Sequence, residues 1–230
     1  MSDSNDHVAE TLRAWDLAAG KYADTIDADV AALLAGALGL SPPERDVLLP
    51  LVDESTRLLH LQCSHGQTAL GLWRATGCEV VGLDGSAAML AIAREKSLRL
   101  EAPSERVRFV KADVLAPPSE LAGWATVLLT SSGALPWVRE RFSPTGAPVP
   151  HAWEHQWALG QVVTAVAAAG LRIERLVEYA AHFWPQFPSV PQEELARLPH
   201  SFLLVARHGS EPRPTAIDAD TSAECTDAPL

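Results

Sequence analysis

Apolar residues follow two different spacings along the first half of the chain. Residues 58–63 form a short apolar run, the small and polar residues 64–66 break it, residues 68–75 resume at helical spacing, and residues 79–83 form a second apolar run closed by Asp84. A strand, a turn, a helix and a second strand in this order fill about 30 residues, the length of a parallel βαβ unit. The pattern therefore predicts an α/β fold whose ligand-binding loops follow the carboxyl ends of its strands.

The same patterns predict elements over most of the chain. Apolar residues at helical spacing indicate N-terminal helices over residues 7–23 and 24–40, with Pro42 and Pro43 ending the second helix. The other predicted elements are a short helix at 44–52, strands at 58–63, 79–84, 107–112, 125–131, 171–179 and 201–207, and helices at 67–76, 86–98 and 159–169. This alternation is typical of a parallel sheet covered by helices.

The expected organisation is one α/β domain preceded by helices and followed by a tail. With 230 residues, 47% of them hydrophobic, the chain is long enough to bury one core. We assign residues 1–56 to N-terminal helices that act as a lid and residues 57–208 to the α/β domain. Residues 209–230 are expected to form a disordered acidic tail, because they are rich in Pro, Asp, Ser and Thr and lack aromatic residues.

Charge and composition restrict the possible partners. The formal net charge is -11, and lysine occurs only at Lys21, Lys96 and Lys111, so a nucleic-acid partner is not expected. The three cysteines are odd in number and unmatched in spacing, which argues against a disulfide framework. No apolar run approaches the length of a membrane span, and the N-terminus has no signal-peptide pattern, so we expect a cytoplasmic protein without membrane partners.

The turn between the first predicted strand and its helix has the chemistry of a nucleotide site. Ser64 and Gly66 are small enough to let the backbone approach a ligand, and the helix that follows offers free N–H groups. Asp84 comes about 20 residues after the turn, where dinucleotide-binding folds place the acid that accepts from a ribose diol. A nicotinamide-dependent dehydrogenase would need a fuller G-x-G-x-x-G turn than this one, in which Gly66 holds the one clear glycine position.

Residues 57–89 resemble motifs I and II of class I S-adenosylmethionine-dependent methyltransferases, in a subgroup whose first strand reads LHLQC. Two further segments resemble the same subgroup: residues 130–137, which read T-S-x-G-x-L-x-W, and residues 153–157, which read W-E-H-Q-W. The resemblance extends over roughly residues 15–207. It implies a Rossmann-like methyltransferase sheet with helices on both faces, whose last strand runs antiparallel to the others.

The resemblance also implies a site for S-adenosylmethionine at the ends of four strands. Asp84 would accept hydrogen bonds from the ribose hydroxyls, Met89 would lie beside the adenine, and Asp113 would bind the adenine amino group. The full set of residues implied to bind the cofactor is His60, Gln62, Ser64, Gly66, Asp84, Gly85, Met89, Ala112, Asp113, Val114 and Ser131.

Catalysis depends on fewer residues, because methyl transfer from a sulfonium is an in-line substitution that mainly requires positioning. An oxygen or nitrogen acceptor can still need a base, for which we favour His155 and Tyr22. His151, Glu154 and His182 are the other candidates. No metal is expected: His60, Cys63, His65 and Cys78 are close in sequence, but His60 and Cys63 fall on opposite faces of a strand.

The resemblance is interrupted between Trp137 and Trp153. The family places a fifth strand there, whereas this chain has about 15 residues of loop composition, so we expect a shortened sheet without that strand. The fourth strand would then pair with a later strand or expose an apolar edge that favours a homodimer.

The leading hypothesis is a methyltransferase that uses S-adenosylmethionine and a small-molecule methyl acceptor. The alternative is a shortened methyltransferase-like protein that binds the cofactor without transferring a methyl group, as an interaction subunit or a non-methylating enzyme. The interruption after Trp137 is the feature on which this alternative depends.

Overall fold

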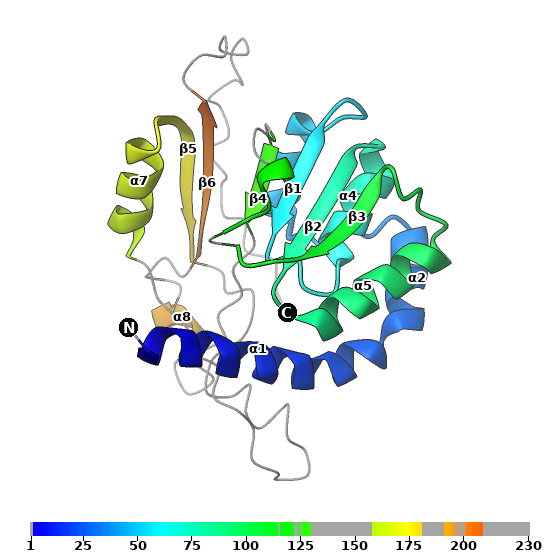
Figure 1. Ribbon diagram of the computed structural model, residues 1–230. Helices are drawn as coiled ribbons and strands as arrows, with labels where there is room; N and C mark the ends of the chain where they lie inside the picture. The colour runs from blue at the N-terminus through cyan, green and yellow to red at the C-terminus, as the bar shows by residue number, and fades with distance from the viewer. Residues whose placement is uncertain are drawn as a thin grey trace. The chain divides into compact units, whose positions relative to one another are not determined.

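The computed structural model describes residues 2–114, 116–121, 124, 126–129, 158–180, 191–195, 197 and 201–208. The chain divides into two compact units, Met1–His155 and Gln156–Leu230 (Figure 1). The first unit holds the N-terminal helices together with the parallel strands. This division differs from the boundaries after residues 56 and 208 that the sequence suggested, and those boundaries stay predictions.

A four-stranded parallel sheet forms the centre of the first unit. Its strands are β1 (Arg57–Leu61), β2 (Glu79–Asp84), β3 (Val107–Lys111) and β4 (Thr126–Leu129). They lie in the order β3-β2-β1-β4, so the direction in which strands are added reverses between β1 and β4. This is the order of a Rossmann-like sheet, and the predicted α/β class is confirmed.

Both faces of this sheet are covered, which explains why its strands read as apolar runs. Leu58 and Val80 are both 0% exposed and point to one face. The helices α2 (Ile26–Leu34), α4 (Gln67–Thr76) and α5 (Ala87–Arg99) pack on this face. Leu59 and Val81 point to the other face, where Leu121 and Trp124 complete a second cluster. The described residues therefore place α-helices on the first face and the 3-10 turn η2 (Ser119–Leu121) on the second.

The helices of the first unit agree with the predicted order but differ at one junction. They are α1 (Ser2–Ala23), α2 (Ile26–Leu34), α3 (Pro42–Leu48), the 3-10 helix η1 (Leu49–Leu51), α4 (Gln67–Thr76) and α5 (Ala87–Arg99). The prediction that Pro42 and Pro43 end the second helix is wrong. α2 already ends at Leu34, followed by Gly36 at a φ of 94°, and Pro42 begins α3, where its missing N–H costs nothing.

The described residues of the second unit form a two-stranded sheet and two helices. The elements are α7 (Leu159–Ala168), β5 (Leu171–Tyr179), α8 (Gln192–Leu195) and β6 (Ser201–His208). β5 and β6 are antiparallel, with an irregularity between Ile173 and Arg175. Glu174 accepts hydrogen bonds from Arg172 and Arg207 at 2.8 and 2.7 Å. The expected absence of a fifth strand concerns residues 138–152, which lie outside the described residues, and it stays a prediction.

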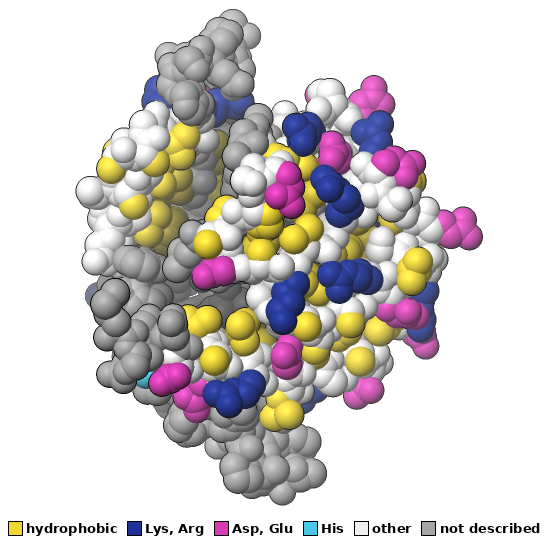
Figure 2. Space-filling model, in the orientation of Figure 1, with side chains coloured by type: hydrophobic (Ala, Val, Ile, Leu, Met, Phe, Trp, Pro, Cys, Tyr) yellow, Lys and Arg dark blue, Asp and Glu magenta, His cyan; other side chains and the backbone are white. Residues whose placement is uncertain are grey.

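The surface of the first unit carries both signs of charge. Figure 2 shows Lys and Arg side chains interspersed with Asp and Glu over the face in view, with apolar side chains between them. Among the described residues, no helix has both the length and the apolar character that crossing a membrane requires.

Candidate functional site

The loops that follow β1 and β3 are joined to the end of β2 by backbone hydrogen bonds at the carboxyl edge of the sheet. The N–H of Cys63 donates to the carbonyl of Leu83 at 3.1 Å, and the N–H of Ala112 donates to the carbonyl of Asp84 at 3.1 Å. The loop after β1, residues 62–66, lies beside the position where the strand order reverses. Open parallel sheets bind ligands at this position, because the loops on its two sides diverge and leave a crevice.

The 62–66 loop has the backbone of a glycine-rich turn with one glycine. Gln62, Ser64 and Gly66 have φ angles of 54°, 51° and 75°. All three residues lie in the left-handed region that glycine enters without steric cost. The loop therefore has the backbone conformation of a glycine-rich turn although two of the three residues are not glycine. The strain at Gln62 and Ser64 must be offset by surrounding contacts.

Gly66 is needed for packing beneath the loop. A Cβ atom at this position would lie 2.8 Å from Cβ of Ala93 in α5 and 2.9 Å from the ring of Phe109 in β3. Distances this short require one of the neighbours to move. The glycine thus lets the start of α4 pack closely against α5 and the sheet, as the third glycine of a dinucleotide-binding turn does.

Asp84 connects the loop after β1 to the start of α5. Its Oδ2 accepts a hydrogen bond from the N–H of Ser64 at 2.8 Å, and its Oδ1 accepts one from the N–H of Ser86 at 2.8 Å. The residue is half-buried at the carboxyl end of β2. A carboxylate offers about four acceptor positions, so two hydrogen bonds to the backbone leave capacity for hydroxyl donors of a ligand.

Helix α1 is attached next to this carboxylate. Asp16 accepts a hydrogen bond from the hydroxyl of Ser86 at 2.6 Å and one from the N–H of Ala88 at 3.2 Å. Ser86 itself accepts from the N–H of Met89 at 3.1 Å, as the N-cap of α5. Leu12 covers Gly85 so closely that a Cβ there would lie 2.6 Å from its Cδ2. The N-terminal helix therefore lies over the end of β2.

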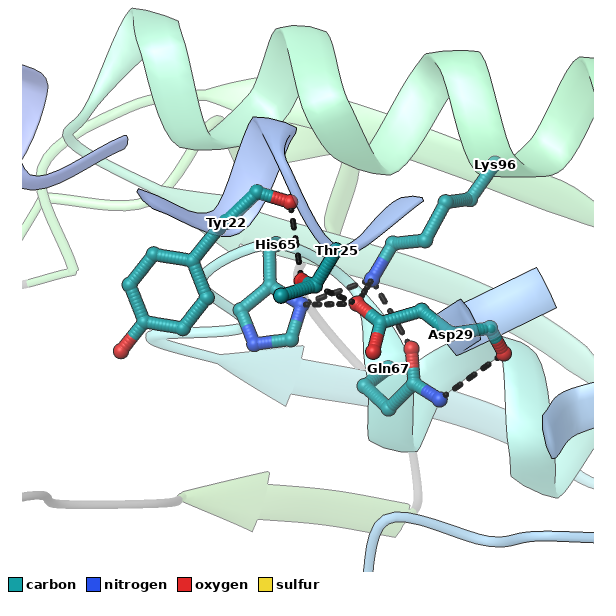
Figure 3. A network of polar contacts seen from close by, with 6 residues as sticks. All are labelled: Tyr22, Thr25, Asp29, His65, Gln67 and Lys96. Atoms are coloured by element: carbon teal, nitrogen blue, oxygen red, sulfur yellow. Dashed lines mark hydrogen bonds and ion pairs between the residues drawn. The ribbon is translucent and has the colours of Figure 1, made fainter. Parts of the chain in front are cut away.

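A second polar cluster lies on the other side of the same loop (Figure 3). The side chain of Lys96 in α5 is 0% exposed, and its Nζ lies 2.7 Å from Nδ1 of His65, 2.9 Å from Oε1 of Gln67 and 3.3 Å from Oδ2 of Asp29. The ring of Tyr22 stacks on the ring of His65, with centroids 4.4 Å apart. We call Tyr22, Asp29, His65, Gln67 and Lys96 the Lys96 network.

Burial changes the protonation of this network. Burial, assisted by the charge of Lys96, lowers the pKa of His65 to about 4, so its imidazole is neutral at pH 7. Burial lowers the pKa of Lys96 to about 8, although Asp29 opposes the shift. Burial and the charge of Asp29 raise the pKa of Tyr22, so its phenol keeps its proton at neutral pH.

The predicted cofactor residues fall into three groups. Gln62, Ser64, Gly66, Asp84, Gly85, Ala112 and Asp113 lie on or next to the joined loops. His60, Met89 and Val114 pack inward: His60 is 2% exposed within β1, Met89 is 1% exposed beneath Ala18 and Ala19 of α1, and Val114, like Ala112, packs on the second apolar cluster. Ser131 lies outside the described residues, as do His151, Glu154, His155 and His182 among the catalytic candidates.

Two residues that the sequence analysis weighed as metal ligands, His60 and Cys63, are buried. Among the described residues, no three His, Cys, Asp or Glu side chains gather as a metal site requires. Burial lowers the pKa of His60 to about 4 and raises the pKa of the Cys63 thiol. Both side chains are therefore neutral at pH 7.

Sequence reasoning missed Lys96, Asp29 and Gln67 and considered His65 only as a metal ligand. The contacts between them join residues up to 67 positions apart, so no local motif contains them. One signal was present. The buried positions of α5 are Met89, Leu90, Ile92, Ala93 and Lys96, so the apolar spacing of this helix already placed a lysine on its buried face.

The strand order and the loops at the carboxyl edge of the sheet define an α/β protein with a Rossmann-like parallel sheet. Comparison with known families adds that residues 58–142 match the family described as "Methyltransferase domain". The matched segment contains β1 except for Arg57, the strands β2 to β4, the 62–66 loop, Asp84 and Asp113.

Comparison with individual proteins gives local and distant similarities. Over 75 residues the chain is 48% identical to a demethylmenaquinone methyltransferase of Thermus thermophilus. The aligned segment covers 32% of this chain and 33% of that protein. The chain thus spans about a third of the length of this curated relative.

The chain is also similar to solved structures of methyltransferases, with TM-scores below 0.5. A geranyl diphosphate methyltransferase in complex with SAM has a TM-score of 0.48 at 19% identity, covering 72% of this chain and 77% of that one. A geranyl diphosphate C-methyltransferase from Streptomyces coelicolor A3(2), in complex with Mg²⁺, geranyl diphosphate and S-adenosyl-L-homocysteine, has a TM-score of 0.47 at 14% identity, covering 77% and 81%.

Proposed function

We propose that this chain binds S-adenosylmethionine at the 62–66 loop and transfers its methyl group to a small molecule. The observation that carries this proposal is the half-buried Asp84 carboxylate, which joins the start of α5 to the loop after β1. This loop lies beside the position where the strand order reverses. The methyltransferase match over residues 58–142 and the name of the Thermus thermophilus relative support the same activity.

The residues present fit such a cofactor. The acceptor positions that Asp84 keeps beyond its two backbone hydrogen bonds suit a ribose diol, and Asp113, exposed just after β3, is the residue that we assign to the adenine amino group. The bound cofactor would supply an activated methyl group, whose transfer leaves a neutral thioether. Gln62, Ser64 and Gly66 shape the loop, and the first N–H groups of α4 provide donors beside it.

The catalytic assignments remain proposals about His155 and Tyr22. The raised pKa of Tyr22 makes its hydroxyl a hydrogen-bond donor at neutral pH, so its part in the reaction is to orient a group and not to remove a proton. Removal of a proton from an oxygen or nitrogen acceptor therefore falls to His155 in this proposal.

Calorimetric titration of the full chain with S-adenosylmethionine and with S-adenosylhomocysteine tests cofactor binding. We expect saturable heat with both, and about 10- to 100-fold weaker binding by Asp84→Asn, because the amide replaces one acceptor oxygen by a donor. Glu79→Gln is the matched control. Glu79 lies at the opposite end of β2, where it pairs with Arg57 and Arg108 on the surface, and its removal should leave affinity unchanged.

Absence of heat with either ligand at millimolar concentration would refute the proposal. Methyl transfer is measured separately, by following radiolabelled methyl groups into a panel of small-molecule acceptors, with protein and RNA as competing acceptors. Binding without transfer to any of them would favour the cofactor-binding protein without methyl transfer.

A further inference from the structure

Lys96 is one of three lysines in the chain, and its side chain is fully buried. A buried ammonium is costly unless each of its three N–H groups finds an acceptor. Here the three acceptors come from three different segments: Asp29 from α2, His65 from the loop after β1, and Gln67 from the first position of α4. The lysine therefore joins the N-terminal helices to the loop.

The contact with His65 fixes where the imidazole carries its proton. A lysine ammonium has donors and no acceptor, so Nδ1 of His65, 2.7 Å away, must be the acceptor. A neutral imidazole that accepts at Nδ1 carries its proton at Nε2. Figure 3 shows this second ring nitrogen pointing away from Lys96. The Tyr22 ring packs against the imidazole and limits its rotation.

His65 is also the residue between the two left-handed positions Ser64 and Gly66. Glycine would hold this backbone shape without strain, but Ser64 needs neighbouring contacts to hold it. Asp84 supplies one contact, through the N–H of Ser64, and Lys96 supplies the other, through the side chain of His65. Held at two adjacent residues, the loop keeps its shape with one glycine.

We propose that Lys96 is a positioning residue of the candidate cofactor site: its ammonium holds His65 as the Nε2-protonated imidazole and thereby holds the 62–66 loop in its binding conformation. This inference rests on the proposed function, because it assigns the loop to cofactor binding. Lys96 acts through His65 and is buried away from any ligand.

Loss of the proton from Lys96 removes the reason for this tautomer. A neutral amine can accept a hydrogen bond from Nδ1–H, so His65 can then carry its proton on either nitrogen. The titratable groups that face Lys96 are Asp29 from α2 and His65 from the loop, with Tyr22 of α1 stacked behind His65. Of these, Lys96 changes charge near pH 8, so affinity for the cofactor should fall as the pH rises through about 8.

The test combines calorimetry with NMR spectra that correlate imidazole nitrogens and ring protons, with His65 assigned from the spectrum of His65→Gln. Wild-type protein should show the Nε2-protonated form of His65 at pH 7. Lys96→Met should show both tautomers, bind S-adenosylhomocysteine about 10-fold or more weakly, and lose the decline in affinity near pH 8. Lys21→Met, which removes an exposed lysine of α1, should match wild type.

Asp29→Asn provides a second variant that keeps the volume of the side chain. Removing the carboxylate that favours the charged lysine should move the decline in affinity to lower pH. Unchanged affinity in Lys96→Met, or an unchanged tautomer of His65, would overturn the inference. If wild-type protein binds neither S-adenosylmethionine nor S-adenosylhomocysteine, the proposed function itself fails. The tautomer spectra would then still report whether Lys96 controls His65.

Discussion

The 62–66 loop is held from two sides by contacts of different kinds. On one side, the Asp84 carboxylate accepts hydrogen bonds from the backbone N–H groups of Ser64 and Ser86. On the other side, the Lys96 ammonium contacts the side chains of His65 and two further residues. Backbone donors do not titrate, whereas both members of the Lys96–His65 contact do: the pKa of Lys96 is lowered to about 8 and that of His65 to about 4. We therefore predict that pH changes the contacts on the Lys96 side of the loop. The contacts on the Asp84 side depend on the backbone geometry of Ser64 and Ser86.

Acid pH should have the largest effect on stability. The pKa of His60 and that of His65 are both lowered to about 4, from an ordinary value of 6.5, so the unfolded chain binds more protons than the folded protein between these values. Stability is therefore lost as the pH falls from about 6.5 to about 4, by about 3 kcal/mol for each histidine. Urea unfolding followed by circular dichroism across this range measures the loss.

Two variants separate the histidines. His60→Leu should remove about one proton from the pH dependence of the free energy of unfolding, because burial alone lowers the pKa of His60. Lys96→Met should remove only a part of the contribution that His65 makes to this pH dependence, because burial lowers the pKa of His65 more than the charge of Lys96 does. If the free energy of unfolding of His60→Leu depends on pH as steeply as that of wild type, the pKa of His60 is not lowered in the folded protein.

Gly66→Ala should have the next largest effect, a decrease of about 3 kcal/mol in the free energy of unfolding. The new methyl group would be too close to Ala93 and Phe109, and the φ of 75° disfavours alanine. Gly77→Ala, at the opposite end of α4, is the control. Gly77 follows α4 at a φ of 74°, but a Cβ there would lie 3.5 Å from Glu54, an ordinary contact. We expect a loss of about 1 kcal/mol for the control. Equal losses in the two variants would show that packing at Gly66 contributes nothing.

Asp16→Ala should have the smallest effect, a loss of about 1 kcal/mol, because it removes the acceptor shared by Ser86 and Ala88 at the start of α5. The thermal unfolding midpoint measures it. Asp46→Ala, which removes an exposed partner of Arg45, should change the midpoint less. If the two variants shift it equally, Asp16 does not anchor α1 to α5.

The sequence by itself determined the order of the elements, because helical spacing and short apolar runs report which positions are buried. The helix at 67–76 and the strands at 79–84 and 171–179 agree with the structure at both ends. Asp84 and the turn before α4 could be found for the same reason, since they lie within one βαβ unit. Pro42 was misread because a proline signals the end of one helix and the start of the next equally well.

Only the tertiary structure decided what holds the loop in place. Lys96, His65 and Asp29 come from three segments, and their contact depends on how α2 and α5 pack on the sheet. The tertiary structure also decided which predicted residues face the loops. His60 and Met89 match the family pattern, but the strand interior and helix α1 bury them. Spacing along a chain records which residues are buried, whereas the partners of a buried polar group depend on packing between distant segments.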